Sequence, residues 1–334
     1  MRLEVGAESD RGQRKEANED HYAVYLPGDS GVPDLKDGGL LVVADGLGGH
    51  FAGDVASKLA VTIMKDFLTT DRNRSESPLK LLTSTAHKAN TQINNANRGL
   101  KGYFRPMGTT LTTVFVEGDT AYYCHVGDSR SYLIRGEQIQ LVTEDHSWVE
   151  EQVKMGLMTR EEAKRDPRRH VVTRTLGTRP EAQVDTYEKK LSKGDILVSC
   201  TDGLSNTVKS KEILAICNEA EDAQEAAERL VRKANERGAP DNVTVIVAVV
   251  EPERSKLASK KFRQSAKRAL KTTAKIVLLV AVLTGVFLLG HYVGRRNALE
   301  SVDADLDGAV PYDQTQPGAQ DMQADSSFES PVVE

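Results

Sequence analysis

Cysteine, tryptophan and aromatic residues are scarce in this chain of 334 residues, which has three cysteines, one tryptophan and 5% aromatic residues. The cysteines, Cys124, Cys200 and Cys217, lie in apolar runs and share no metal-ligand spacing. We therefore expect small buried residues in a reducing compartment, which argues against a redox or metal-ligand role.

Neither charge sign dominates the chain as a whole. The formal net charge of -5 is mild and argues against a general nucleic-acid-binding protein. Charged residues make up 28% and hydrophobic residues 39%, as in an ordinary globular protein. Residues 1–20 are polar and charged, so we expect no signal peptide there.

Long apolar runs are missing too, except for residues 276–294. This run has no Lys, Arg, Asp or Glu over 19 residues, which is long enough for a helix to cross a bilayer. A buried core helix is the alternative, but the residues that follow could not build a core around it. We therefore predict a single transmembrane helix at 276–294.

The charges on either side of this run predict its orientation. Residues 253–275 contain nine Lys and Arg and form a basic juxtamembrane segment. Residues 295–334 begin with two arginines and then carry nine acids, as a disordered tail does. The positive-inside rule predicts that residues 1–275 lie in the cytoplasm and that the acidic tail lies outside the inner (cytoplasmic) membrane.

The stretch 40–50, LLVVADGLGGH, is the most informative part of the chain. Residues 40–44 predict a buried strand that runs directly into Asp45 and Gly46. A buried carboxylate is costly unless its charge is compensated, and glycine lets backbone carbonyls approach a ligand. A hard cation such as Mg²⁺, Mn²⁺ or Ca²⁺ would compensate it, whereas a plain tight turn is the alternative.

Other acids also stand next to predicted strands. They are Asp128, Asp202 and Asp241, together with Glu19 and Asp20 in a polar loop that carries Arg14 and Lys15. A single acid of this kind is readily explained as a turn residue. Two buried strands that each end in Asp-Gly-Leu are harder to explain as turns.

Apolar periodicity predicts helices and strands in alternation. Amphipathic helices are expected at 55–67, 79–96, 212–218 and 223–234. Strands are expected at 22–26, 110–116, 120–126, 130–134, 138–142, 196–200 and 243–250. The runs between 110 and 142, separated by turn signals, predict an antiparallel meander.

Residues 147–180 are expected to cover part of the surface. Ser147 followed by Glu150 predicts a capped helix through Met155. The charged connection at 156–180, punctuated by Gly and Pro, is long enough to suggest a functional flap, with a short helix at 160–165.

Carboxylates that cluster repel each other unless cations lie between them. Carboxylates and carbonyls without His or Cys favour Mg²⁺ or Mn²⁺ over Zn²⁺. Two such ions would turn a bridging water into hydroxide near neutral pH and stabilise an in-line phosphoryl displacement. Arg14 and Lys15 would hold the remaining phosphate oxygens. If the acids converge, these residues indicate metal-assisted hydrolysis of a phosphate ester.

Eight motifs occur in a fixed order: DRG…NED (10–20), VADGLGGH (43–50), GTTL (108–111), VGDSR (126–130), TEDHS (143–147), TRTLG (173–177), CTDGL (200–204) and PDNVT (240–244). Over residues 3–250 the chain resembles the metal-dependent type 2C (PPM) Ser/Thr protein phosphatases in their bacterial form. The resemblance implies a catalytic domain at 1–252 with an α+β fold. That fold is an αββα sandwich of two antiparallel β-sheets flanked by helix pairs.

Carried over motif by motif, the resemblance implies two Mn²⁺ or Mg²⁺ ions. Asp45 would bridge both ions, and the carbonyl of Gly46 would bind one of them. Asp202 and Asp241 would complete the site of the other.

The resemblance also implies supporting groups. Glu19 would act through bound water, with Asp20 behind it. Asp128, with Asp202, matches the site of a third, weaker metal in bacterial members. The segment after Ser147 matches a flap that modulates substrate access.

Two positions depart from the family pattern. The family's phosphate-binding Arg lies three residues before the Asn of the NED motif, where this chain has Lys15, next to Arg14. Lys lacks the planar fork of Arg, so we expect Lys15 to act as a point charge with Arg14 assisting. Many eukaryotic members have a His, a proposed general acid, where this chain has Leu47. Metal-bound water or another residue would then protonate the leaving group; His50 and His146 are candidates, although a structural role is expected for both.

Two functions are consistent with these patterns. The first is a membrane-anchored phosphatase that acts on phospho-Ser and phospho-Thr of cytoplasmic proteins by attack of a metal-bridging hydroxide, and that opposes a cognate Ser/Thr kinase. The second is a catalytically weak signalling scaffold or sensor at the membrane, which only Lys15 supports. The complete set of acids favours the first, because a scaffold has no need for carboxylates that repel one another.

Overall fold

A computed structural model describes residues 1–29, 35–48, 51–69, 77–99 and 106–251. The chain divides into two compact units, Met1–Gln264 and Ser265–Glu334, and every described residue belongs to the first. The predicted basic segment (253–275), transmembrane helix (276–294) and acidic tail (295–334) lie outside the described residues. In the part that is described, no helix has the length and apolar character needed to cross a bilayer.

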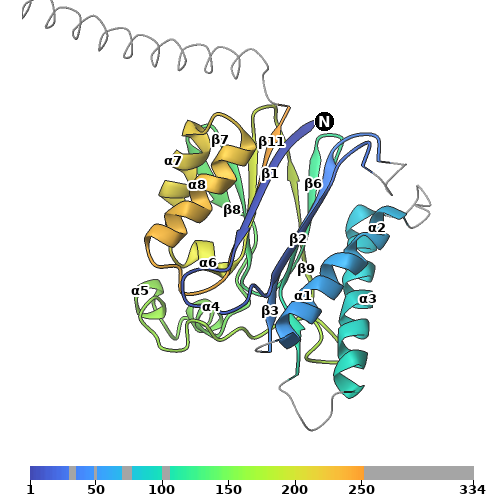
Figure 1. Ribbon diagram of the computed structural model, residues 1–334, viewed down its shortest axis with the longest axis vertical. Coiled ribbons are helices and arrows are strands. Elements are labelled where there is room, and N and C mark those ends of the chain that lie inside the picture. Colours follow the sequence, from blue (N-terminus) through green and yellow to red (C-terminus); the bar gives the residue numbers. More distant parts are fainter. Residues whose placement is uncertain (30–34, 49–50, 70–76, 100–105, 252–334) are drawn as a thin grey trace, which may run out of the picture. The chain divides into compact units, whose positions relative to one another are not determined.

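Two antiparallel sheets form the centre of the first unit (Figure 1). In spatial order, the first contains β1 (Leu3–Asp10), β11 (Val243–Val250), β10 (Ile196–Cys200), β7 (Arg130–Arg135) and β8 (Gln138–Leu141). The second contains β2 (Asp20–Tyr25), β3 (Gly39–Leu47), β5 (Leu111–Glu117), β6 (Thr120–Val126) and β9 (Asp185–Lys190), and the short β4 (Gly108–Thr109) pairs with β3.

Helices cover the outer faces of both sheets (Figure 1). The second sheet is covered by α1 (Phe51–Met64), α2 (Asp66–Thr69) and α3 (Pro78–Gly99), and the first by α7 (Ser210–Glu219) and α8 (Ala223–Glu236). The short helices α4 (Trp148–Lys154), α5 (Arg160–Ala163) and α6 (Asp202–Ser205) lie in connections. The predicted αββα sandwich is therefore confirmed.

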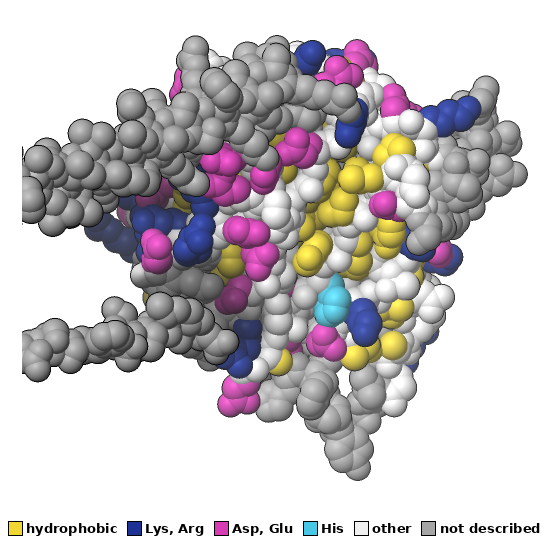
Figure 2. Space-filling model, turned by 45° about the horizontal axis from the view of Figure 1, so that its top comes forward, with side chains coloured by type: hydrophobic (Ala, Val, Ile, Leu, Met, Phe, Trp, Pro, Cys, Tyr) yellow, Lys and Arg dark blue, Asp and Glu magenta, His cyan; other side chains and the backbone are white. Residues whose placement is uncertain are grey.

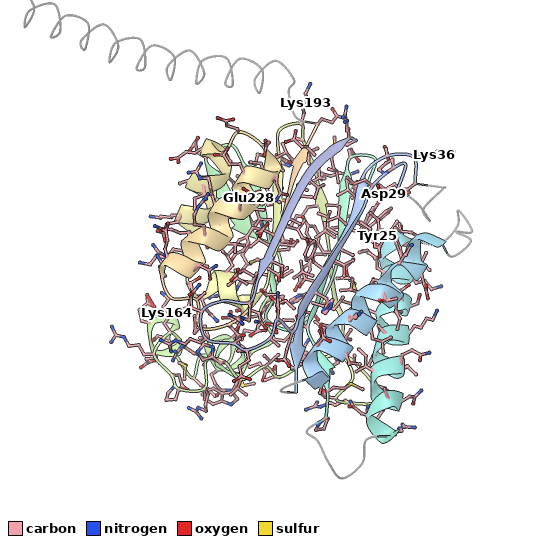
Figure 3. All side chains as sticks on the ribbon, viewed as in Figure 1. Tyr25, Asp29, Lys36, Lys164, Lys193 and Glu228 are labelled. Atoms are coloured by element: carbon pink, nitrogen blue, oxygen red, sulfur yellow. The ribbon has the colours of Figure 1, made fainter. Side chains whose placement is uncertain are left out.

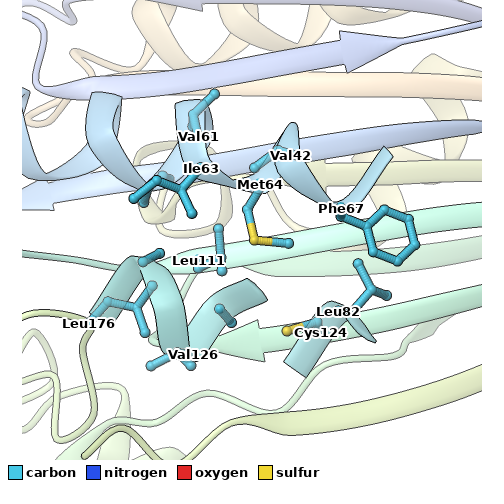
Figure 4. Packing of buried hydrophobic residues seen from close by; sticks show 14 of the residues in the cluster. Val42, Val61, Ile63, Met64, Phe67, Leu82, Leu111, Cys124, Val126 and Leu176 are labelled. Carbon is cyan, nitrogen blue, oxygen red and sulfur yellow. The ribbon is translucent and has the colours of Figure 1, made fainter. Parts of the chain in front are cut away.

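Strand β3 shows how the cores are assigned. Its alternate residues Leu40, Val42 and Ala44 belong to the cluster beneath α1 and α3, whereas Leu41 and Val43 belong to the core between the sheets. Figure 4 shows the first cluster, in which side chains of β3, β5 and β6 meet those of the helices. A strand buried on both faces reads as a continuous apolar run, as residues 40–44 do.

Figure 2 shows one face of the described part, where hydrophobic side chains gather next to acidic ones. The core between the sheets includes partly buried side chains on both edge strands, Val5 on β1 and Val24 on β2. Both side chains extend the core between the sheets to its edges, so packing explains why apolar residues stand at these partly exposed positions.

The predicted meander over 110–142 is wrong. Strands β5 and β6 pair in the second sheet, but β7 and β8 belong to the first. The chain changes sheets at Gly127, which has φ +112° and leaves no room for a Cβ against Thr110. A turn signal in the sequence does not distinguish a hairpin from a crossing between sheets. Which of the two forms depends on the hydrophobic cores against which β6 and β7 pack.

Two further elements differ from prediction. The helix expected at 55–67 begins at Phe51 and is broken after Met64, where α2 follows. Strand β9 was not predicted, because its sequence DTYEKK is polar and only partly buried. Its pairing with β6 supplies the backbone hydrogen bonds that its composition does not indicate.

Candidate active site

The strand pair β2–β3 brings two acids together. In its antiparallel register, Asp20 is the cross-strand partner of Asp45. The backbone N–H of Asp45 donates to Thr110 Oγ1 at 2.9 Å, and its carbonyl accepts from the Thr110 N–H at 2.9 Å. These bonds hold β3 at the point where its apolar residues give way to Asp45.

Gly46 follows Asp45, and its position leaves no room for a side chain. A Cβ there would lie 2.3 Å from the carbonyl oxygen of Gly53 and 2.6 Å from that of Glu19. Glycine therefore lets the start of α1 and the residue before β2 close around the end of β3. This steric role adds to the metal-binding role predicted for the Gly46 carbonyl.

Strands β10 and β11 bring two more acids to one end of the first sheet. Cys200 pairs with Val245 in an antiparallel register, so Asp202, just after β10, and Asp241, just before β11, lie at the same end. Gly203 permits the close approach, because a Cβ there would lie 1.9 Å from the carbonyl oxygen of Asn242.

We expect Gly203→Ala to lower the free energy of unfolding by about 2–3 kcal/mol, because the added methyl meets backbone that cannot turn aside. Thermal unfolding monitored by circular dichroism measures the change. Gly99→Ala is the matched control, since a Cβ at Gly99 meets nothing within 4 Å. Equal melting temperatures for the two variants would contradict the prediction.

The predicted acids share one electrostatic environment. Burial and the nearby Asp202 and Asp241 raise the pKa of Asp20 to about 7. Burial and Asp241 raise the pKa of Asp202 to about 6. Burial, followed by the charges of neighbouring acids, raises the pKa of Asp45 and of Asp128 well above the ordinary range. The acids interact with one another, so folding has brought them together.

These pKa values predict how stability depends on pH when divalent ions are removed. A carboxyl whose folded pKa exceeds its unfolded value of about 3.9 binds more protons when folded, so stability falls as pH rises through the folded pKa. We expect the Tm in chelator to fall between about pH 4 and about pH 7, the window of Asp20 and Asp202. Asp20→Asn should flatten this dependence, and a Tm that rises across the window would contradict it.

Two buried carboxylate oxygens of the cluster, Asp20 Oδ1 and Asp202 Oδ1, have no hydrogen-bond partner among the described residues. The other oxygen of Asp20 accepts from Thr201 Oγ1 at 2.9 Å and Thr244 Oγ1 at 2.7 Å. Buried carboxylate oxygens in an all-oxygen donor set fit Mg²⁺ or Mn²⁺. Among the described residues, no three His, Cys, Asp or Glu side chains form a compact ligand group. The structure thus establishes a shared acidic site, and the individual ligand roles remain predictions.

Lys15 lies at the edge of this site. Its ammonium forms an ion pair with Asp241. Partial burial disfavours the charged form, but the hydrogen bond to Asp241 and the charges of Asp45 and Glu19 outweigh it and raise the pKa of Lys15. The neighbouring Arg14 is exposed. Of the two predicted phosphate-binding cations, Lys15 is the one that contacts the acids.

Asn242 holds the loop that carries Lys15 and Glu19, a role that was not predicted. Its Oδ1 accepts from the Glu19 N–H at 2.9 Å, and its Nδ2 donates to the carbonyls of Arg11 at 2.8 Å and Ala17 at 2.9 Å. The loop before β2 is thereby fixed to the start of β11. The motif PDNVT contains the signal, because an amide side chain can satisfy several backbone groups at once.

His146 has the structural role expected of it. It is buried, its Nδ1 accepts from the Gly127 N–H at 3.1 Å, and its own backbone N–H donates to the Gly127 carbonyl at 2.8 Å. Burial lowers its pKa although Asp185 acts in the opposite sense. His146 therefore holds the turn that precedes Asp128, while His50 lies outside the described residues.

The segment after Ser147 contains the predicted short helices. Ser147 Oγ accepts from the Glu150 N–H at 3.3 Å and caps α4. Thr159 and Glu162 form a capping box at α5, which covers most of the helix expected at 160–165.

Comparisons with known proteins agree with this fold. Residues 13–246 match the profile of the family described as protein phosphatase 2C. The serine/threonine phosphatase stp of Listeria monocytogenes is 35% identical over 244 residues, which cover 72% of this chain and 92% of that protein. The crystal structure of the Mycobacterium tuberculosis serine/threonine phosphatase PstP/Ppp has a TM-score of 0.66 and 34% identity, covering 75% of this chain and 100% of that one.

A second solved structure is the catalytic domain of PstP in complex with two manganese ions, with a TM-score of 0.63 and 33% identity over 74% of this chain and 97% of that one. The chain belongs to the protein phosphatase 2C family. It is an enzyme of the serine/threonine phosphatase class, to which these relatives belong by name.

Proposed function

We propose that this chain hydrolyses phospho-Ser and phospho-Thr on cytoplasmic proteins with two Mn²⁺ or Mg²⁺ ions. The observation that carries the proposal is the convergence of the acids: Asp20 lies opposite Asp45, Asp202 and Asp241 share one sheet end, and Lys15 pairs with Asp241. One buried carboxylate oxygen each of Asp20 and Asp202 has no hydrogen-bond partner among the described residues. The two manganese ions in the similar PstP structure support the same metal content here.

The resemblance distributes the ligands among these residues. Asp45, the Gly46 carbonyl, Asp202 and Asp241 would hold the two ions, and Asp128 with Asp202 a third. Glu19 would act through water and Asp20 would support it. When bound, such ions would lower the pKa of a water molecule, so that a hydroxide nucleophile is available near neutral pH.

Lys15 would bind and orient the phosphate. An ammonium has three N–H donors, so it can stay on the carboxylate of Asp241 and still donate to a phosphate oxygen. Because Asn242 fixes the Lys15 loop at both sides, the cation is held in place before the substrate arrives. Arg14 would assist from the solvent side.

The test uses purified protein with an aryl phosphate and a phosphopeptide, each with Mn²⁺, Mg²⁺ or a chelator. We expect phosphate release only with a divalent ion. Metal affinity and phosphopeptide affinity, measured beside turnover, separate this function from a scaffold. Tight peptide binding without hydrolysis in the presence of metal would favour the scaffold and overturn the proposal.

We also propose that residues 276–294 anchor the enzyme in the inner membrane by a single pass, with residues 1–275 in the cytoplasm and the acidic tail outside. The full-length protein should stay in the membrane fraction after a carbonate wash, whereas a chain ending at residue 252 should not. Recovery of both forms in the soluble fraction would contradict the anchor.

A cognate Ser/Thr kinase is the proposed functional opponent of this enzyme. Comparing phosphoproteomes with and without the gene would reveal the substrates that the two enzymes share.

A further inference from the structure

The flap, defined as residues 156–180, carries an excess of positive charge. Four of its cations have an acidic partner: Arg160 with Glu150, Lys164 with Glu161, Arg168 with Asp166 and Arg174 with Asp185. The other three, Arg165, Arg169 and Arg179, are exposed and form no ion pair with any described residue, and Arg165 and Arg169 lie in the part of the flap next to α4 and α5. Their charges are therefore available to a partner.

Arg169 lies in a turn, residues 166–169, that hydrogen bonds hold in a fixed conformation. The Arg168 guanidinium donates to both oxygens of Asp166 at 3.0 Å and lies 3.5 Å from the ring centroid of Trp148. The N–H of Arg169 donates to the Asp166 carbonyl at 3.1 Å, and the Trp148 N–H donates to the Val171 carbonyl at 2.8 Å. The turn is thus fixed to the start of α4, which lowers the entropy cost of using Arg169 in binding.

This turn lies beside the acidic site. Ser147 forms a β-bridge with Val172, three residues after Arg169, and the N–H of His146 donates at 2.8 Å to the carbonyl of Gly127, the residue before Asp128. Lys15, the predicted phosphate ligand, lies in the β1–β2 loop and pairs with Asp241. In the view of Figure 1 this loop and the segment that carries α4 and α5 lie at the same end of the two sheets, and Figure 3 shows Lys164 at the outer edge of that segment. Phosphate held at Lys15 would therefore place the neighbouring peptide near Arg169.

We propose that Arg169, with Arg165, binds acidic side chains that flank the phosphorylated residue, so that the enzyme prefers phosphoproteins with Asp or Glu near the phosphate. The proposal rests on the proposed function and deepens it by naming a substrate class. An extended peptide advances about 3.3 Å per residue, so we expect the preference to be confined to residues close in sequence to the phosphoresidue. Opposite charges at an exposed surface give modest, salt-sensitive selectivity.

The test compares three phosphothreonine peptides that differ only in flanking residues, which are Glu, Gln or Lys. With full-length protein and Mn²⁺ at low salt, we expect kcat/KM for the Glu peptide to exceed that for the Gln peptide by about three- to tenfold. The ratio should shrink towards one at high salt. A ratio measured within one variant cancels any change in turnover that is common to all substrates.

Variants then test the residues. Arg169→Glu should lower the Glu-to-Gln ratio to one or below, and Arg169→Gln should lower it less. Lys211→Glu, the same charge change at an exposed site on α7, should leave the ratio as in the wild type. An unchanged ratio in both Arg169 variants would overturn the assignment.

An aryl phosphate, which has no flanking residues, separates this inference from the proposed function. No hydrolysis of any substrate would contradict the proposed function itself. Hydrolysis of the aryl phosphate with equal kcat/KM on all three peptides would contradict only the flap proposal.

Discussion

Asp45→Asn is expected to lower metal-dependent turnover by about 10³-fold or more, because asparagine keeps the shape of the side chain but removes the charge predicted to bridge two ions. The backbone bonds between Asp45 and Thr110 do not involve the carboxylate, so the strand should be retained. Calorimetric titration with Mn²⁺ should show weaker binding, and a phosphopeptide assay measures the loss of turnover.

The stability of this variant supplies an independent check. Burial and neighbouring acids raise the pKa of Asp45, so the charge destabilises the metal-free fold, and Asp45→Asn should melt no lower than the wild type in chelator at pH 7.5. Asp119→Asn is the matched control, since Asp119 is an exposed acid paired with Lys190. It should keep both metal binding and turnover. Undiminished turnover of Asp45→Asn would end the case for a metal site at this residue.

Lys15→Met is expected to lower kcat/KM by about 10- to 100-fold, because a hydrogen bond to a charged group contributes about 1.5–3 kcal/mol. The longer, planar guanidinium of Lys15→Arg should retain most of the activity, as it can bind phosphate oxygens at two points. Steady-state kinetics with a phosphopeptide measures both variants.

Arg14→Met provides the comparison for Lys15, because Arg14 is exposed whereas Lys15 contacts Asp241. We expect a loss of about threefold or less, in line with a screened surface charge. A larger loss for Arg14→Met than for Lys15→Met would show that the loop presents Arg14 to the phosphate, and would exchange the roles assigned to the two residues.

Most elements of the fold are predictable from local patterns. The apolar run at 40–44 indicates a strand buried on both faces, and β3 is such a strand. The predicted helix at 79–96 corresponds to α3, and that at 223–234 to α8. These predictions succeed because one face of each element must be apolar to reach a core.

Non-local contacts explain the failures. The polar strand β9 exists because β6 offers it a free edge, and β7 leaves the expected meander because its Tyr132 and Ile134 pack beneath α7 and α8. In the site, the role of Asn242 depends on a distant part of the sequence, since Asn242 and its hydrogen-bond partner Glu19 are 223 residues apart.

By itself, the order of residues determined which acids stand beside strands, because apolar periodicity and glycine punctuation are local properties. It also determined that the donors are oxygen atoms, and hence the class of metal that suits them. Only the tertiary structure decided that Asp20 lies opposite Asp45 and that Asp202 and Asp241 share a sheet end. The physical reason is that register and sheet membership arise from long-range pairing and core packing, which bring together carboxylates that repel one another in the isolated chain.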